Sequence, residues 1–223
     1  MRQNLFNRFV RTLSPNNLTR YSLSRNHSNK VDVNSADRKE DLENTMRVIA
    51  NFVTPEEEES LMEEIDPYMR RLRYEQSHWD DAIHSYRETE RSKWNGRNEE
   101  IVNKIREKAF PKGMSQLPLI HVLDLAPEGW IKPHVDSVRF CGEIIAGLSL
   151  LTDCVMRLKM VENEKVSKDF LLPRRSLYIM SGTARYDYNH EILKNEESYF
   201  QGERVAKDRR ISVICRSQPN PES

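Results

Sequence analysis

The chain has 223 residues, of which 37% are hydrophobic and 31% are charged, and its 35 basic and 35 acidic residues cancel. This length suits one domain with a short extension. Three cysteines without a Cys-x-x-Cys pair argue against both a disulfide framework and a zinc knuckle. No hydrophobic run approaches the roughly 18 residues of a membrane-spanning helix, so we expect no membrane insertion.

Residues 1–30 are predicted to be a mitochondrial transit peptide. They contain six Lys or Arg residues and no acidic residue, and hydrophobic residues recur between the arginines at helical spacing, which is typical of such peptides. The alternative is a disordered basic tail. The first interpretation places the protein in the mitochondrial matrix, and residues 31–45 are then a flexible polar linker.

Residues 46–112 are predicted to be a helical segment that packs on the domain that follows it. Residues 48–53 are expected to be a short strand or an extended entry. Thr54, Pro55 and Glu57 then have the pattern of a helix start, with Thr54 as the N-cap. A second helix is predicted over residues 99–110.

His78 and His84 lie between the two predicted helices. Six residues apart, they fit neither the helical nor the strand spacing of a pair of metal ligands. We therefore expect them to form hydrogen bonds or to belong to a lid.

Residues 113–217 are predicted to be the core domain, because short β-rich runs separated by turn residues replace the helical pattern there. Residues 126–129 and 181–182 are interpreted as breaks between strands. We expect a double-stranded β-helix of the jelly-roll or cupin type, so that the chain is mainly β with flanking helices (α+β), and a short tail at 218–223. The predicted strands are 117–125, 144–151, 154–160, 170–172, 177–180 and 211–215.

His134 and Asp136 form the first candidate site. They lie two residues apart, so on an extended strand both side chains leave the same face. A histidine and a carboxylate are two thirds of a 2-His-1-carboxylate triad, which binds Fe(II) and leaves positions open for a cosubstrate and O₂. The alternative is a surface strand with two polar side chains.

The second histidine of such a triad has two candidates. His121 precedes the pair on a neighbouring hydrophobic strand, whereas His190 follows it much later in the chain. A late strand of a jelly roll can return beside an early one, so we favour His190.

The last predicted strand carries two arginines on one face, where Arg210, Ser212, Ile214 and Arg216 alternate with hydrophobic neighbours. An arginine that points into a hydrophobic barrel needs an anionic partner, because an unpaired buried guanidinium is very costly. A dicarboxylate cosubstrate would supply one through a bidentate contact.

Together these motifs resemble the AlkB family of Fe(II)- and 2-oxoglutarate-dependent dioxygenases over about residues 46–217. The resemblance rests on order and spacing. The matching motifs are His134-x-Asp136, Ser181-Gly182-x-x-Arg185-Tyr186 leading to His190, and Arg210 followed by Arg216.

The resemblance implies a role for each candidate residue. His134, Asp136 and His190 would bind the iron, and Arg210 would pair with the distal carboxylate of 2-oxoglutarate. Tyr178 would donate its hydroxyl to that same carboxylate. Ser212 and Arg216 are further candidates for cosubstrate binding, although Arg216 could instead contact the substrate.

The chain also departs from the family at two places. Leu123-Asp124-Leu125 stands where many AlkB proteins carry Asn-x-Tyr, so cosubstrate binding must rely more on Arg210 and Tyr178. Val138 stands where nucleobase demethylases of the family tend to carry an acidic residue.

The resemblance implies an enzyme that hydroxylates a C–H bond with Fe(II), 2-oxoglutarate and O₂. Residues 31–223 hold 29 basic and 35 acidic residues, and residues 54–110 hold 10 and 15. This balance disfavours duplex DNA unless arginines between residues 70 and 91 form a local basic patch. We expect a protein or peptide side chain as the substrate, with demethylation of single-stranded or transfer RNA as the alternative and a non-catalytic binding module as a second alternative, and we expect a monomer.

Overall fold

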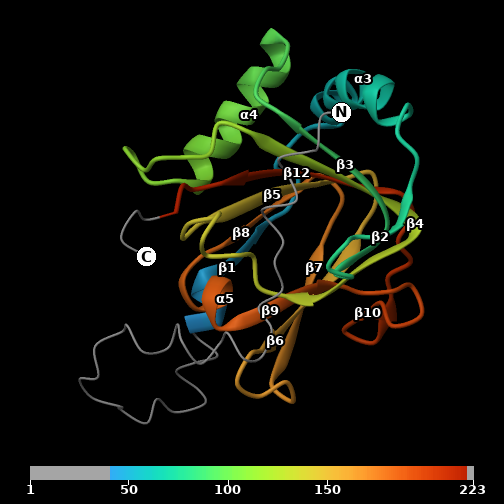
Figure 1. Cartoon of the computed structure of the whole chain (residues 1–223), viewed down its shortest axis with the longest axis vertical. Helices are drawn as coiled ribbons and strands as arrows, with labels where there is room; N and C mark the ends of the chain where they lie inside the picture. The colour runs from blue at the N-terminus through green and yellow to red at the C-terminus, as the bar shows by residue number, and fades with distance from the viewer. Residues whose placement is uncertain (1–40, 220–223) are drawn as a thin grey trace.

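Twelve strands and the helices α3, α4 and α5 follow one another along the described part of the chain (Figure 1). The computed structural model describes residues 41–219. The helices are α3 (Pro55–Met69), α4 (Gly96–Ala109) and α5 (Gly182–Tyr186). The strands are β1 (Met46–Ile49), β2 (Glu75–Ser77), β3 (Ile83–Arg91), β4 (Ile120–His134), β5 (Ile145–Leu150), β6 (Cys154–Met160), β7 (Ser167–Leu172), β8 (Ser176–Met180), β9 (Tyr188–Ile192), β10 (Tyr199–Phe200), β11 (Glu203–Arg204) and β12 (Arg210–Arg216).

Ten of these strands form one sheet that curls into two facing layers. The strand order is β1-β8-β5-β12-β4-β9-β6-β7, with β3 paired to β4 and β2, while β10 and β11 form a separate pair. Neighbouring strands run antiparallel throughout. The expected jelly roll is confirmed, because late strands return beside early ones in both layers.

Strand β4 connects the two layers. Its first half pairs with β12, and its second half pairs with β9. The prediction of a break at residues 126–129 is therefore wrong, since β4 continues through them. Gly129 makes this possible: a Cβ there would lie 2.6 Å from the carbonyl oxygen of Ser85 in β3, at an irregularity in the β3–β4 register.

The two long helices cover the outer face of one layer (Figure 1). Thr54 and Glu57 form the predicted capping box at the start of α3. Helix α4 begins at Gly96 rather than at the predicted residue 99, because Asn95 caps it. Hydrophobic side chains of both helices pack against those of β5, β8 and β12 in one buried cluster.

The segment 46–112 is not purely helical, and this corrects its prediction. It contributes β1, β2 and β3 to the sheet. The nine residues of β3 escaped prediction because both faces of that strand carry polar side chains, so hydrophobic residues do not alternate along it. Residues 41–45, predicted to belong to a flexible linker, are helical.

The predicted transit peptide lies outside the described residues, as do residues 31–40 of the predicted linker and residues 220–223 of the tail. Within residues 41–219, the helices are all too short or too polar to span a bilayer.

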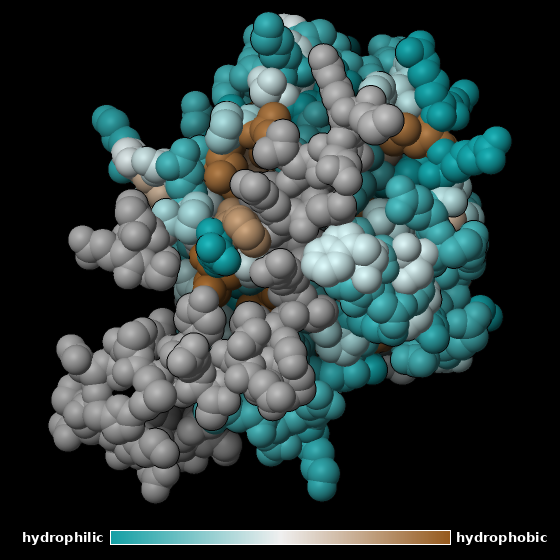
Figure 2. Space-filling model, in the orientation of Figure 1, coloured by the Kyte–Doolittle hydropathy of each residue, from teal (hydrophilic) through white to brown (hydrophobic). Residues whose placement is uncertain are grey.

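A second hydrophobic cluster lies between the two layers and surrounds the candidate site. The described residues on the face drawn in Figure 2 are mostly hydrophilic, with a few small hydrophobic patches. The site is therefore enclosed by the curled sheet and rests on a hydrophobic core.

Candidate metal and cosubstrate site

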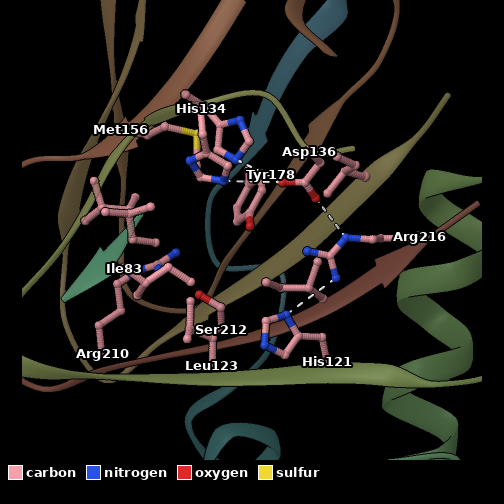
Figure 3. A pocket seen from close by; sticks show the side chains of 15 residues that line it. Ile83, His121, Leu123, His134, Asp136, Met156, Tyr178, Arg210, Ser212 and Arg216 are labelled. Atoms are coloured by element: carbon pink, nitrogen blue, oxygen red, sulfur yellow. Dashed lines mark hydrogen bonds and ion pairs between the residues drawn. The ribbon is translucent and has the colours of Figure 1, made fainter. Parts of the chain in front are cut away.

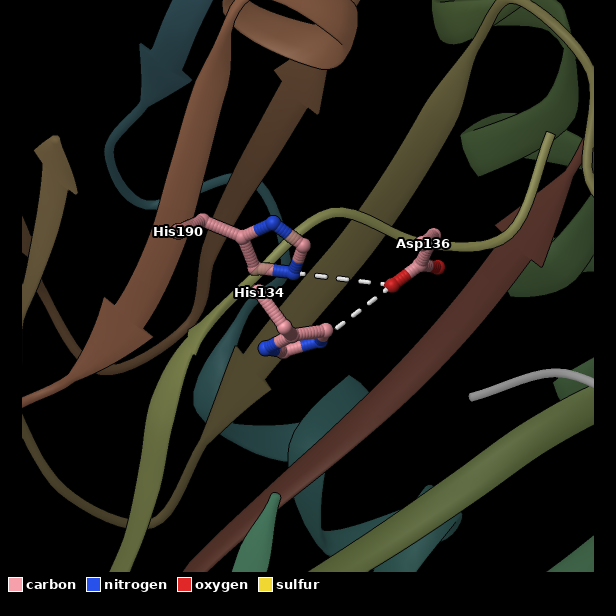
Figure 4. A group of neighbouring side chains, drawn as sticks. All are labelled: His134, Asp136 and His190. Carbon is pink, nitrogen blue, oxygen red and sulfur yellow. Dashed lines mark ion pairs between the residues drawn. The ribbon is translucent and has the colours of Figure 1, made fainter. Parts of the chain in front are cut away.

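His134, Asp136 and His190 come together at one end of the space between the layers (Figure 4). His134 is the last residue of β4 and pairs directly with His190 in β9. Asp136 lies two residues beyond the end of β4. Its Oδ1 is 3.4 Å from Nε2 of His134 and 3.7 Å from Nε2 of His190, so the three ligand atoms face one point.

The protonation of the three groups suits metal binding. His134 Nδ1 lies 2.9 Å from the carbonyl oxygen of Lys132. Since a carbonyl only accepts, Nδ1 carries the proton and leaves the lone pair of Nε2 toward Asp136. Burial is the largest of the causes that lower the pKa of His190 to about 3, so its ring is neutral.

Asp136 is ionised despite its burial. Burial alone would raise the pKa of this carboxyl, but the lowering interactions, of which the charge of Arg216 is the largest, outweigh burial and hold the pKa well below its usual range. Two neutral imidazoles and one carboxylate are the donor set of a non-haem Fe(II) site, and the residues present fit that ion.

A pocket extends from this group toward Arg210, as Figure 3 shows. Arg210 is 1% exposed, and its Nε donates to Ser149 Oγ at 3.1 Å. Its Nη2 is buried and has no hydrogen-bond partner within residues 41–219, and the same holds for the hydroxyl of Ser212. Two unsatisfied polar groups in a pocket with mostly hydrophobic walls are the feature expected of an anion subsite.

Tyr178 also lines this pocket, and Gly147 makes room for it. A Cβ at Gly147 would lie 2.2 Å from Cζ of Tyr178, so the phenol ring lies directly over the glycine of the neighbouring strand. Burial raises the pKa of Tyr178, and its hydroxyl therefore stays protonated and can donate.

The guanidinium of Arg216 points toward the group formed by His134, Asp136 and His190, and not toward Arg210. Its Nε donates to Asp136 Oδ2 at 2.9 Å, and its Nη1 lies 3.5 Å from Nδ1 of His121. His121 in turn lies 3.1 Å from a carboxylate oxygen of Glu88. The structure therefore places His121 beside Arg216 and outside the His134, Asp136 and His190 group.

All seven site residues predicted from the sequence line this pocket: His134, Asp136, Tyr178, His190, Arg210, Ser212 and Arg216. Sequence reasoning missed Ser149 and Glu88. Ser149 lies two residues after Gly147 on one face of a hydrophobic run, and this spacing could have singled it out. Glu88 carried no such signal, because its strand was not predicted.

His78 and His84 have the expected hydrogen-bonding role. His78 Nδ1 lies 2.6 Å from Asp80 Oδ1 in the turn between β2 and β3, where both of these side chains are buried. The ring of His84 stacks on Trp130 with 4.3 Å between centroids. Both histidines lie outside the group of potential metal ligands.

Comparisons with known proteins agree with this geometry. The family model described as the 2OG-Fe(II) oxygenase superfamily matches residues 45–216. The mitochondrial alpha-ketoglutarate-dependent dioxygenase alkB homolog 7 of Bos taurus is 50% identical over 178 residues, which are 80% of each chain. Its Mus musculus counterpart is 53% identical over 168 residues, 75% of this chain and 76% of that one.

The fold agrees as well. The solved structure of OsALKBH1 superposes with a TM-score of 0.56 at 9% identity and covers 77% of this chain and 97% of that chain. With half of the aligned residues shared with the two mammalian proteins, the chain belongs to the 2OG-Fe(II) oxygenase superfamily and is a 2-oxoglutarate-dependent dioxygenase of the alkB homolog 7 type, which uses Fe(II), 2-oxoglutarate and O₂.

Proposed function

We propose that His134, Asp136 and His190 hold the iron and that the enzyme hydroxylates a protein side chain in the mitochondrial matrix. The observation that carries the metal assignment is the convergence of one ligand atom from each residue, all within 4.8 Å of one another. Bound Fe(II) supplies the redox chemistry that couples O₂ and 2-oxoglutarate to oxidation of a C–H bond. The protein contributes the ligand geometry and the enclosed pocket.

Replacing a ligand tests the metal site. Asp136→Ala or His190→Ala should abolish Mn(II) binding to the metal-free protein and abolish succinate formation from 2-oxoglutarate, because each removes one of three ligands. His84→Ala is the matched control, since this histidine stacks on Trp130 away from the group. Undiminished metal binding in either ligand variant would refute the assignment.

Arg210 binds the distal carboxylate of 2-oxoglutarate in this proposal. Its unpartnered Nη2 and the nearby Ser212 hydroxyl supply donors at the end of the pocket away from the metal group, and Tyr178 supplies a third donor. Arg216 is already paired with Asp136. We therefore propose that Arg216 contacts Asp136, a proposed metal ligand, rather than the cosubstrate.

Substitution of Arg210 tests this subsite. Arg210→Ala should raise the KM for 2-oxoglutarate by at least about 30-fold, because removing one partner of a desolvated charge pair costs about 2 to 5 kcal/mol. Arg210→Lys should recover only part of the affinity, since an ammonium cannot make a bidentate contact. Arg157→Ala, which removes a surface pair with Asp169, should leave the KM unchanged.

The choice of a protein substrate rests on charge. Three of the five arginines that could have formed a basic patch are paired with acidic groups: Arg70 with Asp66, Arg87 with Asp124 and Arg91 with Glu64. A surface without a basic stripe binds the phosphates of duplex DNA weakly. The acidic balance of residues 54–110 points the same way.

The substrate proposal can be tested with candidate substrates side by side. Mitochondrial matrix protein, single-stranded RNA and methylated duplex DNA are each added to the iron-loaded enzyme at two salt concentrations while succinate is measured. Matrix protein should stimulate succinate release and gain one oxygen atom by mass spectrometry. Stimulation by RNA alone would favour the demethylase alternative, and tight duplex binding with coupled turnover would refute the proposal.

Matrix localisation rests on residues 1–30, which are acid-free and basic, and on the names of the mammalian relatives, which are called mitochondrial. A reporter fused to these residues should enter the matrix. Arg8→Glu with Arg11→Glu should keep the reporter outside, and a cytosolic reporter in the unmodified fusion would contradict the localisation.

A further inference from the structure

Four side chains connect the His134, Asp136 and His190 group to β3, and Figure 3 shows the first three of them, Asp136, Arg216 and His121. Asp136 accepts from Arg216 Nε at 2.9 Å, and Arg216 Nη1 approaches His121 Nδ1 at 3.5 Å. His121 Nε2 then lies 3.1 Å from Glu88 Oε2. The last three residues come from β12, β4 and β3, so the connection crosses three adjacent strands.

The direction of each hydrogen bond follows from the donors available. A guanidinium only donates, so His121 Nδ1 must accept and carries no proton. The single proton of a neutral His121 ring is then on Nε2 and is donated to Glu88. Burial lowers the pKa of His121, which favours this neutral form. The side chain of Glu88 thereby determines how the guanidinium of Arg216 is held.

We propose that Glu88 and His121 are positioning residues that hold Arg216 on one oxygen of Asp136, so that this carboxylate offers a single oxygen to the metal. Arg216 occupies Oδ2, whereas Oδ1 faces the two histidines. The inference rests on the proposed metal role of Asp136. Partners that orient a metal ligand in this way typically change metal affinity by about 10- to 100-fold when they are replaced.

Glu90 provides a matched comparison within the same strand. It lies two residues after Glu88 on the same face of β3 and opposite His121 in the β3–β4 register. It therefore places a second carboxylate in the same region, but the carboxylate that accepts from His121 is that of Glu88. A loss of metal affinity that is specific to Glu88 would separate hydrogen bonding from general negative charge.

The test measures Mn(II) binding to the metal-free full-length protein, with the free ion followed by electron paramagnetic resonance. His121→Leu and Glu88→Leu should each weaken binding by about 10-fold. His121→Gln, whose amide can accept from Arg216 and donate to Glu88, should restore most of the affinity, as should Glu88→Gln. Glu90→Gln should bind Mn(II) like the unmodified protein, and an equal loss in this variant would overturn the proposal.

A second comparison separates positioning from a purely structural role. When Arg216 is already replaced by Ala, His121→Leu and Glu88→Leu should cause no further loss of Mn(II) affinity, because both act through Arg216. Additive losses would overturn the proposal. Should His121→Leu fail to fold, Glu88→Leu gives the same comparison, since the Glu88 side chain is 14% exposed and at the outer end of the connection.

Failure of the underlying metal site can be recognised separately. If Asp136→Ala still binds Mn(II) normally, the metal assignment itself is wrong. If Asp136→Ala abolishes binding while His121→Leu and Glu88→Leu leave it unchanged, the metal site stands and only the positioning role is refuted.

Discussion

Gly147 and Tyr178 illustrate how one missing side chain shapes the pocket. The phenol ring occupies the space that a Cβ at Gly147 would fill, at 2.2 Å. Both residues lie on adjacent strands and are paired in register. Because the contact is so close, a methyl group at residue 147 must displace the ring from its place in the proposed cosubstrate pocket.

We predict that Gly147→Ala raises the KM for 2-oxoglutarate by about 10-fold, the effect of losing one well-placed donor worth about 1.4 kcal/mol, while Mn(II) affinity stays unchanged. Steady-state kinetics and the Mn(II) titration check the two halves. Gly96→Ala is the control, because nothing lies within 4 Å of a Cβ at that position. Equal effects of the two substitutions would contradict the proposed role of the ring.

At single positions, the sequence identified the three residues of the candidate metal site better than the side chains that contact them. The spacing of His134 and Asp136 pointed to one face, but only the pairing of β4 with β9 places His190 directly opposite His134. His121 was an equally plausible imidazole by residue type. Its neighbours, Arg216 and Glu88, are brought to it by strand pairing across long sequence separations, which local patterns do not encode.

Among the elements, those with local signals were predicted well. The capping box defined the start of α3, and β6 has the predicted bounds. Strand β3 was missed because its outer face pairs charges. Arg87 in β3 donates to Asp124 in β4 at 2.7 Å, so a polar residue there replaces the hydrophobic one that a strand pattern requires.

Asp124 holds several elements together. It is fully buried and also accepts from Arg209, at the start of β12, and from the hydroxyl of Tyr74. We predict that Asp124→Asn destabilises the protein by about 3 kcal/mol, because it leaves the buried guanidinium of Arg87 without its carboxylate and removes one of the two carboxylates paired with Arg209. Urea unfolding measures this change.

Asp169→Asn is the control for this prediction. It removes a single pair with Arg157 in which the carboxylate is about one quarter exposed, whereas the Asp124 carboxylate is fully buried and shared by Arg87 and Arg209. The loss in the control should therefore be about 1 kcal/mol or less. If both variants lost the same stability, the Asp124 cluster would have no special role in joining β3, β4 and β12.

For the whole molecule, the predicted jelly roll was correct because alternating hydrophobic runs gave most strands of both layers. The strand predicted for the first part of β4 ended at residue 125, because the proline and glycine within residues 126–129 normally end a strand. In the folded protein Lys207 and Asn195 donate to the carbonyl oxygen of Pro127. These bonds come from a distant loop, which explains why residues 126–129 alone indicated a turn.

The folded protein also keeps two histidines neutral in its interior, and this sets its response to acid. Burial is the main cause of the lowered pKa of both His121 and His190, the latter to about 3. In the unfolded chain each titrates near its ordinary value of about 6.5. Below that pH the unfolded state binds protons that the folded state does not, so stability is full above about pH 6.5 and is lost as the pH falls.

We therefore predict that the free energy of unfolding of the metal-free protein is nearly constant from pH 8 to 7 and falls below about pH 6.5 by up to about 1.4 kcal/mol per pH unit for each histidine. Urea titrations between pH 8 and 4.5 measure this dependence. His121→Gln, which cannot be protonated, should lower the slope. A slope unchanged by His121→Gln would contradict a neutral buried His121, and with it the hydrogen-bond directions between Glu88 and Arg216.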